Sequence, residues 1–309
     1  MLAKSRPAIN LLCLSLSSAV LVAQGHGPSF GYSTTLLGAG DASFGSALTW
    51  RSGVAMLGPV VAYGLTENIQ FSFSAPLDVN YGEHPVGRFT ALMPGNPEAE
   101  LLAAWRFHHK LTGIATRNES TLYLGTSTTT QLVPRADGPP IRRAPGFYAA
   151  AATGHISRRY YVWAGAGFER YASLDGLDHE GSSLLSSLVV GWRPPRWDRE
   201  YPHPDIRFFW ETTGERIGSA WRSVAAPAGT GDHGVVIPTP EAGSSGIIVL
   251  PDSGGNAVYS GPTFLCTYRS FAFQSGVLFP LWRDENGIQP TERFRALASV
   301  TYFLLGRHK

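Results

Sequence analysis

The sequence predicts an all-β protein: a transmembrane, antiparallel, up-and-down β-barrel of about twelve strands. Three observations support this fold class. Apolar and polar residues alternate over stretches of about ten residues, the length that crosses a bilayer at a tilt. The links between these stretches are alternately short and long. Glycine is abundant, with 35 residues, and charged residues make up 16% of the chain, below the roughly 25% of a typical soluble domain.

The first 25 residues have the features of a secretory signal peptide. A positively charged start precedes an apolar core at 9–22, which is too short to cross a membrane as a helix. Small residues precede a cleavage site after Gly25. We therefore expect residues 1–25 to be removed on export, which leaves residues 26–309 as a single barrel domain in the bacterial outer membrane.

The alternation is clearest at 69–75 and at 294–304, where every second residue is apolar. Such a period of two marks a strand with one apolar and one polar face. In a membrane barrel the apolar face meets lipid and the other face lines the lumen. We expect strands at 42–51, 54–64, 67–76, 99–109, 117–127, 146–156, 159–170, 184–193, 205–217, 257–268, 271–281 and 292–304.

The lengths of the links predict the orientation of the barrel. Outer-membrane barrels have short periplasmic turns and long extracellular loops. An even number of strands then places both termini in the periplasm. The short links are expected at 65–66, 110–116, 157–158, 194–204 and 269–270, and the long ones at 77–98, 128–145, 171–183, 218–256 and 282–291. The first link, at 52–53, is short and breaks the pattern; the segment 218–256 is the longest expected external loop.

Aromatic residues and prolines refine this picture. Aromatic side chains lie near the expected strand ends, where Tyr and Trp favour the membrane interface; these are Trp50, Tyr63, Trp192, Trp282 and Tyr302. Pro59 and Pro262 fall inside expected strands. Because a closed barrel has no free edge, we expect both prolines to mark bulges or strand boundaries. A secreted β-sandwich is the alternative fold, since it shows the same alternation.

Three segments resemble a known family. They are HGPSFGYSTTLLGAGDASFG at the mature start, YGLTENIQFSFSAPL, and the late segment YSGPTFLCTYRSFAFQSGVLFPLW. They resemble the outer-membrane proteins described as transporters of the MetA pathway of phenol degradation and their uncharacterised relatives. The resemblance implies an outer-membrane barrel and a role in transport.

The polar faces of the strands supply candidate lumen residues. A charge on the lipid face is costly at the membrane midplane, so charged residues within strands are expected inside. They form either a polar path for a small solute or a network of ion pairs that plugs a narrow barrel. The candidates are Glu100, Arg106, His108, Glu119, Arg207, Glu211, Arg293 and Arg295.

His26 would become the mature N-terminus after cleavage at Gly25. An α-amino group and an imidazole on one residue form a chelate that suits copper. A second histidine would complete such a site, and the candidates are His108, His155 and His203. The alternative is cleavage after Ala23, or a free tail without metal.

The sequence favours a channel or transporter for small solutes, with outer-membrane lipid and a solute as partners. The near balance of 25 basic and 23 acidic residues gives no basic stripe for nucleic acid. HExxH and a phosphate loop are absent, and we identify no Ser-centred elbow between a strand and a helix, so we expect the protein not to be an enzyme. The alternatives are a structural or surface-interaction barrel with a plugged lumen, and copper binding through His26.

Overall fold

The structure is a computed structural model, which describes most of the residues from 27 to 306. Among the described residues, no helix is long and apolar enough to cross a membrane. The side chains of β4, β5, β6, β10, β13, β14 and β15 lie outside the description. The described ranges are 27–51, 54–74, 77–84, 87–92, 98–109, 117–129, 146–171, 178–179, 182–195, 203–219, 221–225, 235–238, 245–249, 254–286 and 292–306.

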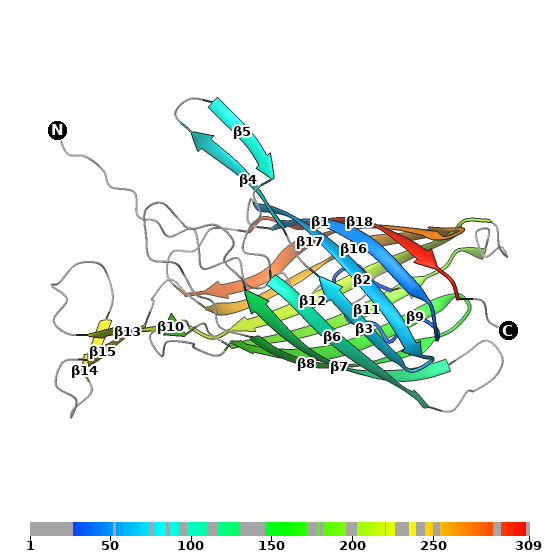
Figure 1. Ribbon diagram of the computed structural model, residues 1–309, viewed down its shortest axis with the longest axis horizontal. Helices are drawn as coiled ribbons and strands as arrows, with labels where there is room; N and C mark the ends of the chain where they lie inside the picture. The colour runs from blue at the N-terminus through cyan, green and yellow to red at the C-terminus, as the bar shows by residue number, and fades with distance from the viewer. Residues whose placement is uncertain are drawn as a thin grey trace.

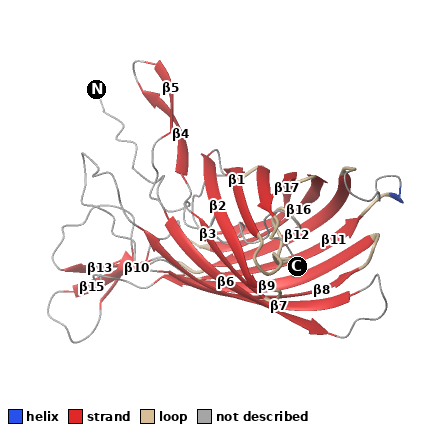
Figure 2. Cartoon of the chain, turned by 45° about the vertical axis from the view of Figure 1, so that its right-hand side comes forward, coloured by secondary structure: helices blue, strands red, loops and turns tan. Residues whose placement is uncertain are grey.

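Within the described ranges, twelve antiparallel strands form a closed barrel (Figures 1 and 2). The ring closes because β1 pairs with β2 on one side and with β18 on the other. The order around the ring is β1-β18-β17-β16-β12-β11-β9-β8-β7-β6-β3-β2. The strands are β1 (Ala42–Arg51), β2 (Val54–Thr66), β3 (Ile69–Ser74), β6 (Glu98–His109), β7 (Arg117–Thr129), β8 (Gly146–Ile156), β9 (Tyr160–Tyr171), β11 (Ser183–Trp192), β12 (Asp205–Ile217), β16 (Gly255–Tyr268), β17 (Phe271–Glu285) and β18 (Arg295–Leu304).

Each of these strands overlaps one that the sequence predicts, so the predicted fold class is confirmed. The alternation has the expected physical basis. Along β11 every second side chain is buried in the interior and the others are exposed, from Ser183 to Trp192. The exposed residues of this strand include Leu184, Leu188 and Val190, which form part of an apolar outer band.

Exposed aromatic rings lie at the end of the barrel that carries the short turns. Trp192 pairs with Tyr160 on one side and with Phe208 on the other. Further around the ring, the centroids of Phe271 and Tyr302 are 5.1 Å apart. Rings at this level suit the border between lipid and water. Of the predicted interface aromatics, Tyr63, Trp192, Trp282 and Tyr302 are exposed, whereas Trp50 is half-buried.

The two strand prolines are accommodated in another way than the sequence suggests. Pro59 pairs in regular register with Ser46 of β1, and Pro262 with Trp210 of β12. On its other side, each proline lies where the strand pairing is interrupted. The register shift in β16 lies at Val258/Tyr259 instead. The expectation of a bulge or boundary at these prolines is therefore wrong. Where the pairing with the neighbouring strand is interrupted, no backbone N–H is required as a donor, so a proline can stand there.

Additional strands lie at the end opposite the C-terminus (Figure 1). The hairpin of β4 (Leu77–His84) and β5 (Gly87–Leu92) extends from β2. A separate sheet contains β10 (Asp178–His179), β13 (Trp221–Ala225), β14 (Val235–Pro238) and β15 (Ser245–Val249). The last three strands belong to the predicted external loop 218–256, in which β14 and β15 pair as a hairpin.

Candidate functional site

The segment 27–41 precedes β1, and its residues 27–37 lie inside the barrel, whereas residues 38–41 form a turn against Gly64 of β2. The carbonyl of Gly27 accepts a hydrogen bond from Gln274 Nε2 of β17 at 2.7 Å. On the opposite side of the ring, the Tyr123 hydroxyl of β7 donates to the carbonyl of Ser33. Near β1, the Leu37 N–H donates to Gln70 Oε1 of β3 at 2.9 Å. A segment that bonds to strands on opposite sides of a closed ring must occupy its lumen.

Glu211 of β12 binds the backbone of this segment. Its carboxylate accepts hydrogen bonds from the N–H groups of Ser29, Phe30 and Gly31, at 2.6, 2.8 and 2.7 Å. Thr263 Oγ1 of β16 also donates to it. The Glu211 side chain is fully buried, and within the described part of the chain no cation contacts it. The negative charge is therefore stabilised by neutral donors, most of which belong to the segment.

Thr34 is a second attachment point. Its hydroxyl donates to Glu119 Oε2 at 3.1 Å and accepts from Trp163 Nε1 at 3.2 Å. The carbonyl of Thr34 accepts from Thr121 Oγ1 at 3.3 Å. Two residues earlier, the Tyr32 N–H donates to Ser187 Oγ at 2.9 Å. Residues 27–37 belong to no strand pairing among the described residues, so these wall side chains satisfy several of their buried backbone groups. Further along, Gly40 and Asp41 exchange backbone hydrogen bonds with Gly64 of β2.

Apolar packing adds to these polar contacts. Three buried apolar clusters occur among the described residues, and the segment contributes to each of them. Tyr32 and Leu36 pack in the first cluster, Leu37 in the second, and Phe30 against the third. Each fully buried side chain of this size contributes about 1.5–3 kcal/mol. The segment is thus held along its length, not only at Glu211.

Two glycines of β9 make room for Tyr32. A Cβ at Gly165 would lie 2.7 Å from Tyr32 Cβ, and a Cβ at Gly167 would overlap the Tyr32 hydroxyl. On the segment itself, a Cβ at Gly31 would overlap Val189 and lie 3.3 Å from Ser187 Cβ. The absence of side chains at these positions allows the segment to approach the wall closely.

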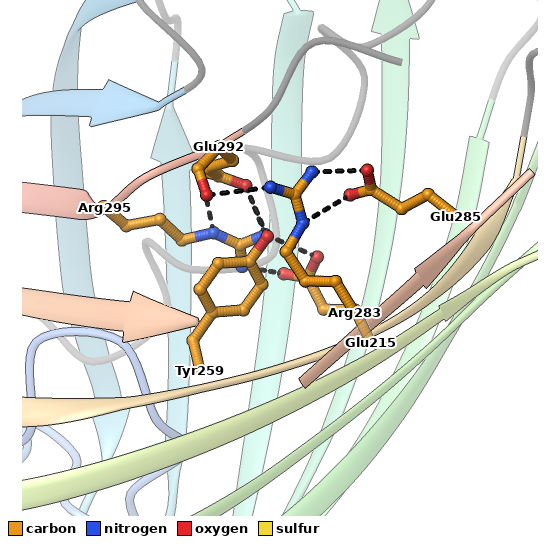
Figure 3. Close-up of polar contacts among 6 residues, drawn as sticks. All are labelled: Glu215, Tyr259, Arg283, Glu285, Glu292 and Arg295. Atoms are coloured by element: carbon orange, nitrogen blue, oxygen red, sulfur yellow. Dashed lines mark hydrogen bonds and ion pairs between the residues drawn. The ribbon is translucent and has the colours of Figure 1, made fainter. Parts of the chain in front are cut away.

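A network of ion pairs includes Glu215, near the end of β12, and Arg295, at the start of β18, which places it nearer the long-loop end of the lumen. Figure 3 shows its contacts. The Arg295 guanidinium donates to both carboxylate oxygens of Glu215 and to both of Glu292. It also lies over the ring of Tyr259, 3.5 Å from the centroid. The Tyr259 hydroxyl donates to Glu292 Oε2 at 2.7 Å. Arg295 is 6% exposed, so these groups are shielded from water.

Arg283 extends the network along β17. It donates to both carboxylate oxygens of Glu285 and, at 2.9 Å, to the backbone carbonyl of Glu292 (Figure 3). Glu292 precedes β18, so these bonds fix the end of the last long loop against the inner wall. The network connects β12, β16, β17 and β18 on one side of the barrel.

The structure places four of the predicted lumen residues inside the barrel: Glu119, Arg207, Glu211 and Arg295. Arg207 pairs with Asp205 at 2.6 Å and lies 5.1 Å from the ring centroid of Tyr161. Arg193 binds the other oxygen of Asp205 at 2.7 Å.

The prediction that Arg293 faces the lumen is wrong. Arg293 precedes β18 and is exposed, so it is not part of the buried network. The remaining predictions concern β6. Glu100 pairs with Ser74, Arg106 with Thr121 and His108 with Glu119, but the side chains of all three lie outside the description.

The predicted copper site at His26 also lies outside the described residues, so it stays a prediction. Of its suggested partners, His155 Nδ1 is 2.7 Å from Asn118 Oδ1, and His203 is exposed. Gly27, which follows His26, is buried.

Sequence reasoning missed the most informative part of the lumen, the segment 27–41. Its residues show no period, and their partners are far away in the sequence. One signal for the segment was present in β9. Gly165 and Gly167 have no side chains on one face of this strand, which leaves space there for Tyr32. The alternation also places Glu215 on the same face as Glu211, and this residue was not among the candidates.

Comparison with known proteins identifies the class of barrel. The chain resembles the crystal structure of the COG4313 outer membrane channel from Pseudomonas putida F1, with a TM-score of 0.52 and 13% identity over 90% of this chain and 99% of the channel. This chain has the fold of an outer-membrane β-barrel. No family model matches it, and no curated protein matches it by sequence. The link to the MetA pathway therefore stays a prediction.

A second solved structure corrects one expectation. LpxR from Salmonella typhimurium matches with a TM-score of 0.41 and 10% identity, over 85% of this chain and 100% of LpxR. LpxR is an outer-membrane lipid A deacylase. The expectation that this chain is not an enzyme rested on missing sequence motifs and is corrected, because an enzyme is among the structural neighbours and the absence of those motifs does not exclude catalysis. A likeness this distant assigns no activity to this chain.

Proposed function

We propose that this protein is an outer-membrane channel for small solutes, and that residues 27–41 control passage through its lumen. The main support for this proposal is that the Glu211 carboxylate accepts hydrogen bonds from three consecutive backbone N–H groups of the segment. Residues 28–37 are not part of the β-ladder, so they can leave the lumen without breaking the barrel. The wall would then be open to a solute, with Glu119, Trp163 and Glu211 on its surface.

The chemistry of the lumen suggests what would pass. The described wall around the segment is rich in aromatic rings, with Tyr123, Tyr148, Tyr161, Trp163 and Phe209 all buried. Aromatic faces favour solutes with apolar or aromatic parts. This composition supports the transport of small aromatic compounds, which the resemblance to the phenol-pathway transporters also implies.

The test compares the mature protein with a variant that lacks residues 28–37. Both are reconstituted in planar bilayers and in liposomes that report solute entry by swelling. We expect low conductance for the complete protein, high conductance for the deletion, and faster entry of phenol than of a sugar of similar size. Heat-dependent gel mobility verifies that both barrels are folded. If the folded deletion variant conducts no better than a protein-free bilayer, the channel proposal fails.

The second candidate is a structural or surface-interaction barrel with a permanently plugged lumen. It is favoured by the three apolar clusters that pack around the segment. It predicts no flux with or without residues 28–37, and binding of a partner that depends on the loops.

Copper binding by His26 is a separate proposal. Mass spectrometry of the mature N-terminus is its first test, because any start other than His26 removes the proposed chelate. The same measurement tests removal of residues 1–25.

A further inference from the structure

Two arginines face outward from the barrel wall on neighbouring parts of its surface. Arg170 of β9 and Arg216 of β12 are both exposed. The residues before them, Glu169 and Glu215, are buried in the lumen. Because side chains alternate along a strand, both guanidinium groups belong to the outer surface.

The strand register brings these two side chains close together. Leu184 of β11 pairs with Phe168 on one side and with Arg216 on the other. Arg170 is two residues beyond Phe168 on the same face of β9. The two arginine Cα atoms are therefore about 12 Å apart, from strand and residue spacings. Phe168 and Leu184 are exposed apolar residues between them.

With the orientation that the loop lengths predict, both arginines lie at the extracellular border of the apolar band. From Phe208, in the periplasmic aromatic row, Arg216 is about 20 Å further along the membrane normal, for a strand tilt of about 40°. From Tyr160, Arg170 is about 25 Å further by the same reasoning. The apolar band of such barrels is roughly 25 Å tall. The guanidinium groups thus reach the headgroup level while their stems lie on apolar surface.

These arginines differ from those inside the barrel. Arg193, Arg207, Arg283 and Arg295 each contact a carboxylate. The side chains of Arg170 and Arg216 make no hydrogen bond or ion pair with any residue in the described part of the chain. In the direction away from β9, Arg216 pairs with Asn256 of β16, and Asn256 pairs with Asp284 of β17, which is exposed. Asp284 repels anions, so the anion-binding surface extends toward β9.

We propose that Arg170 and Arg216, with Phe168 and Leu184 between them, bind a phosphorylated glycolipid of the extracellular leaflet. The lipid A part of lipopolysaccharide has this chemistry, with phosphate groups on a sugar core and acyl chains below. Arginine binds phosphate through two parallel hydrogen bonds. The apolar side chains between the arginines offer a surface for the acyl chains, and basic sites of this kind recognise lipid headgroups.

The test is native mass spectrometry of the complete mature protein in detergent, with diphosphoryl lipid A as the probe. We expect bound lipid A on the wild-type barrel and at least a tenfold weaker apparent affinity for Arg170→Gln/Arg216→Gln. Arg170→Lys/Arg216→Lys keeps the charge and should bind with intermediate affinity, because lysine cannot form the bidentate contact. The matched control is Arg158→Gln/Arg269→Gln, which removes two exposed arginines at the short-turn end and should leave binding unchanged.

Two results would overturn the proposal. One is equal lipid A binding by the wild type and by a folded Arg170→Gln/Arg216→Gln variant. The other is equal affinity of the wild type for phosphatidylglycerol, which would mean that charge alone, and not a glycolipid headgroup, is recognised. Heat-dependent gel mobility establishes that each variant is folded.

Discussion

Glu211 and Glu215 lie on the same face of one strand, four residues apart, yet they stabilise different things. Glu215 pairs with Arg295, so both partners belong to the barrel wall. Glu211 binds backbone N–H groups of residues 29–31, which are outside the ladder. The first contact joins strand to strand, and the second joins the wall to a removable segment. We therefore expect changes at Glu215 and Arg295 to alter barrel stability, and changes at Glu211 to alter conductance.

The largest expected effect comes from Arg295→Met. This change leaves Glu215 and Glu292 buried without their cation, and breaking a buried ion pair typically costs about 3–5 kcal/mol. Urea unfolding in detergent should show a loss of stability of this size, while the conductance of the folded fraction stays low. The matched control, Arg293→Met, removes an exposed arginine two residues earlier and should change stability by less than about 0.5 kcal/mol. A high conductance for Arg295→Met would remove the distinction between the two glutamates.

The next effect concerns Glu211→Ala. A hydrogen bond to a charged group contributes about 1.5–3 kcal/mol, so losing even one such bond should raise the fraction of open channels roughly 10- to 100-fold. Single-channel recordings measure this fraction directly. Glu211→Gln keeps one acceptor oxygen and should give a smaller increase. Unchanged open probability in Glu211→Ala, with the barrel still folded, would show that the segment is held by packing alone.

A smaller effect is expected from Gly167→Ala. The new Cβ would overlap the Tyr32 hydroxyl, and overpacking of this kind costs about 1–3 kcal/mol. Because the segment yields more easily than the β-ladder, the open fraction should rise while the stability of the barrel changes little. Adding Tyr32→Phe removes the overlapping hydroxyl and should restore part of the closed state. If the double variant opens as much as the single one, Tyr32 does not lie against β9.

The strands could be predicted because their signal is local. The alternation from Ile206 to Trp210 or from Ala298 to Tyr302 needs no knowledge of the partner strand. The lumen faces of Glu211 and Arg295 followed from the same pattern. The prediction for Arg293 was wrong because it extended the alternation beyond the start of β18, into the preceding loop.

The contents of the lumen could not be predicted in this way. The partners of the segment lie far along the chain; Gly27 binds Gln274, and Thr34 binds Glu119. Such contacts leave no period in the sequence of the segment itself. Likewise, alternation puts Glu211 and Glu215 on one face but does not say which one meets a cation and which one meets backbone N–H groups.

The most direct test of the account is a reversible cross-link between the segment and the wall. Gly31→Cys and Ser187→Cys would place two sulfur-bearing Cβ atoms about 3.3 Å apart, close to the distance that a disulfide needs. Val189→Ala relieves the overlap at Gly31, and Cys266→Ala removes the free cysteine of the described chain. With Glu211→Ala added, we expect the oxidised protein to have low conductance and the same protein to open when the disulfide is reduced. Equal conductance in the cross-linked and reduced states would contradict control of the channel by residues 27–41.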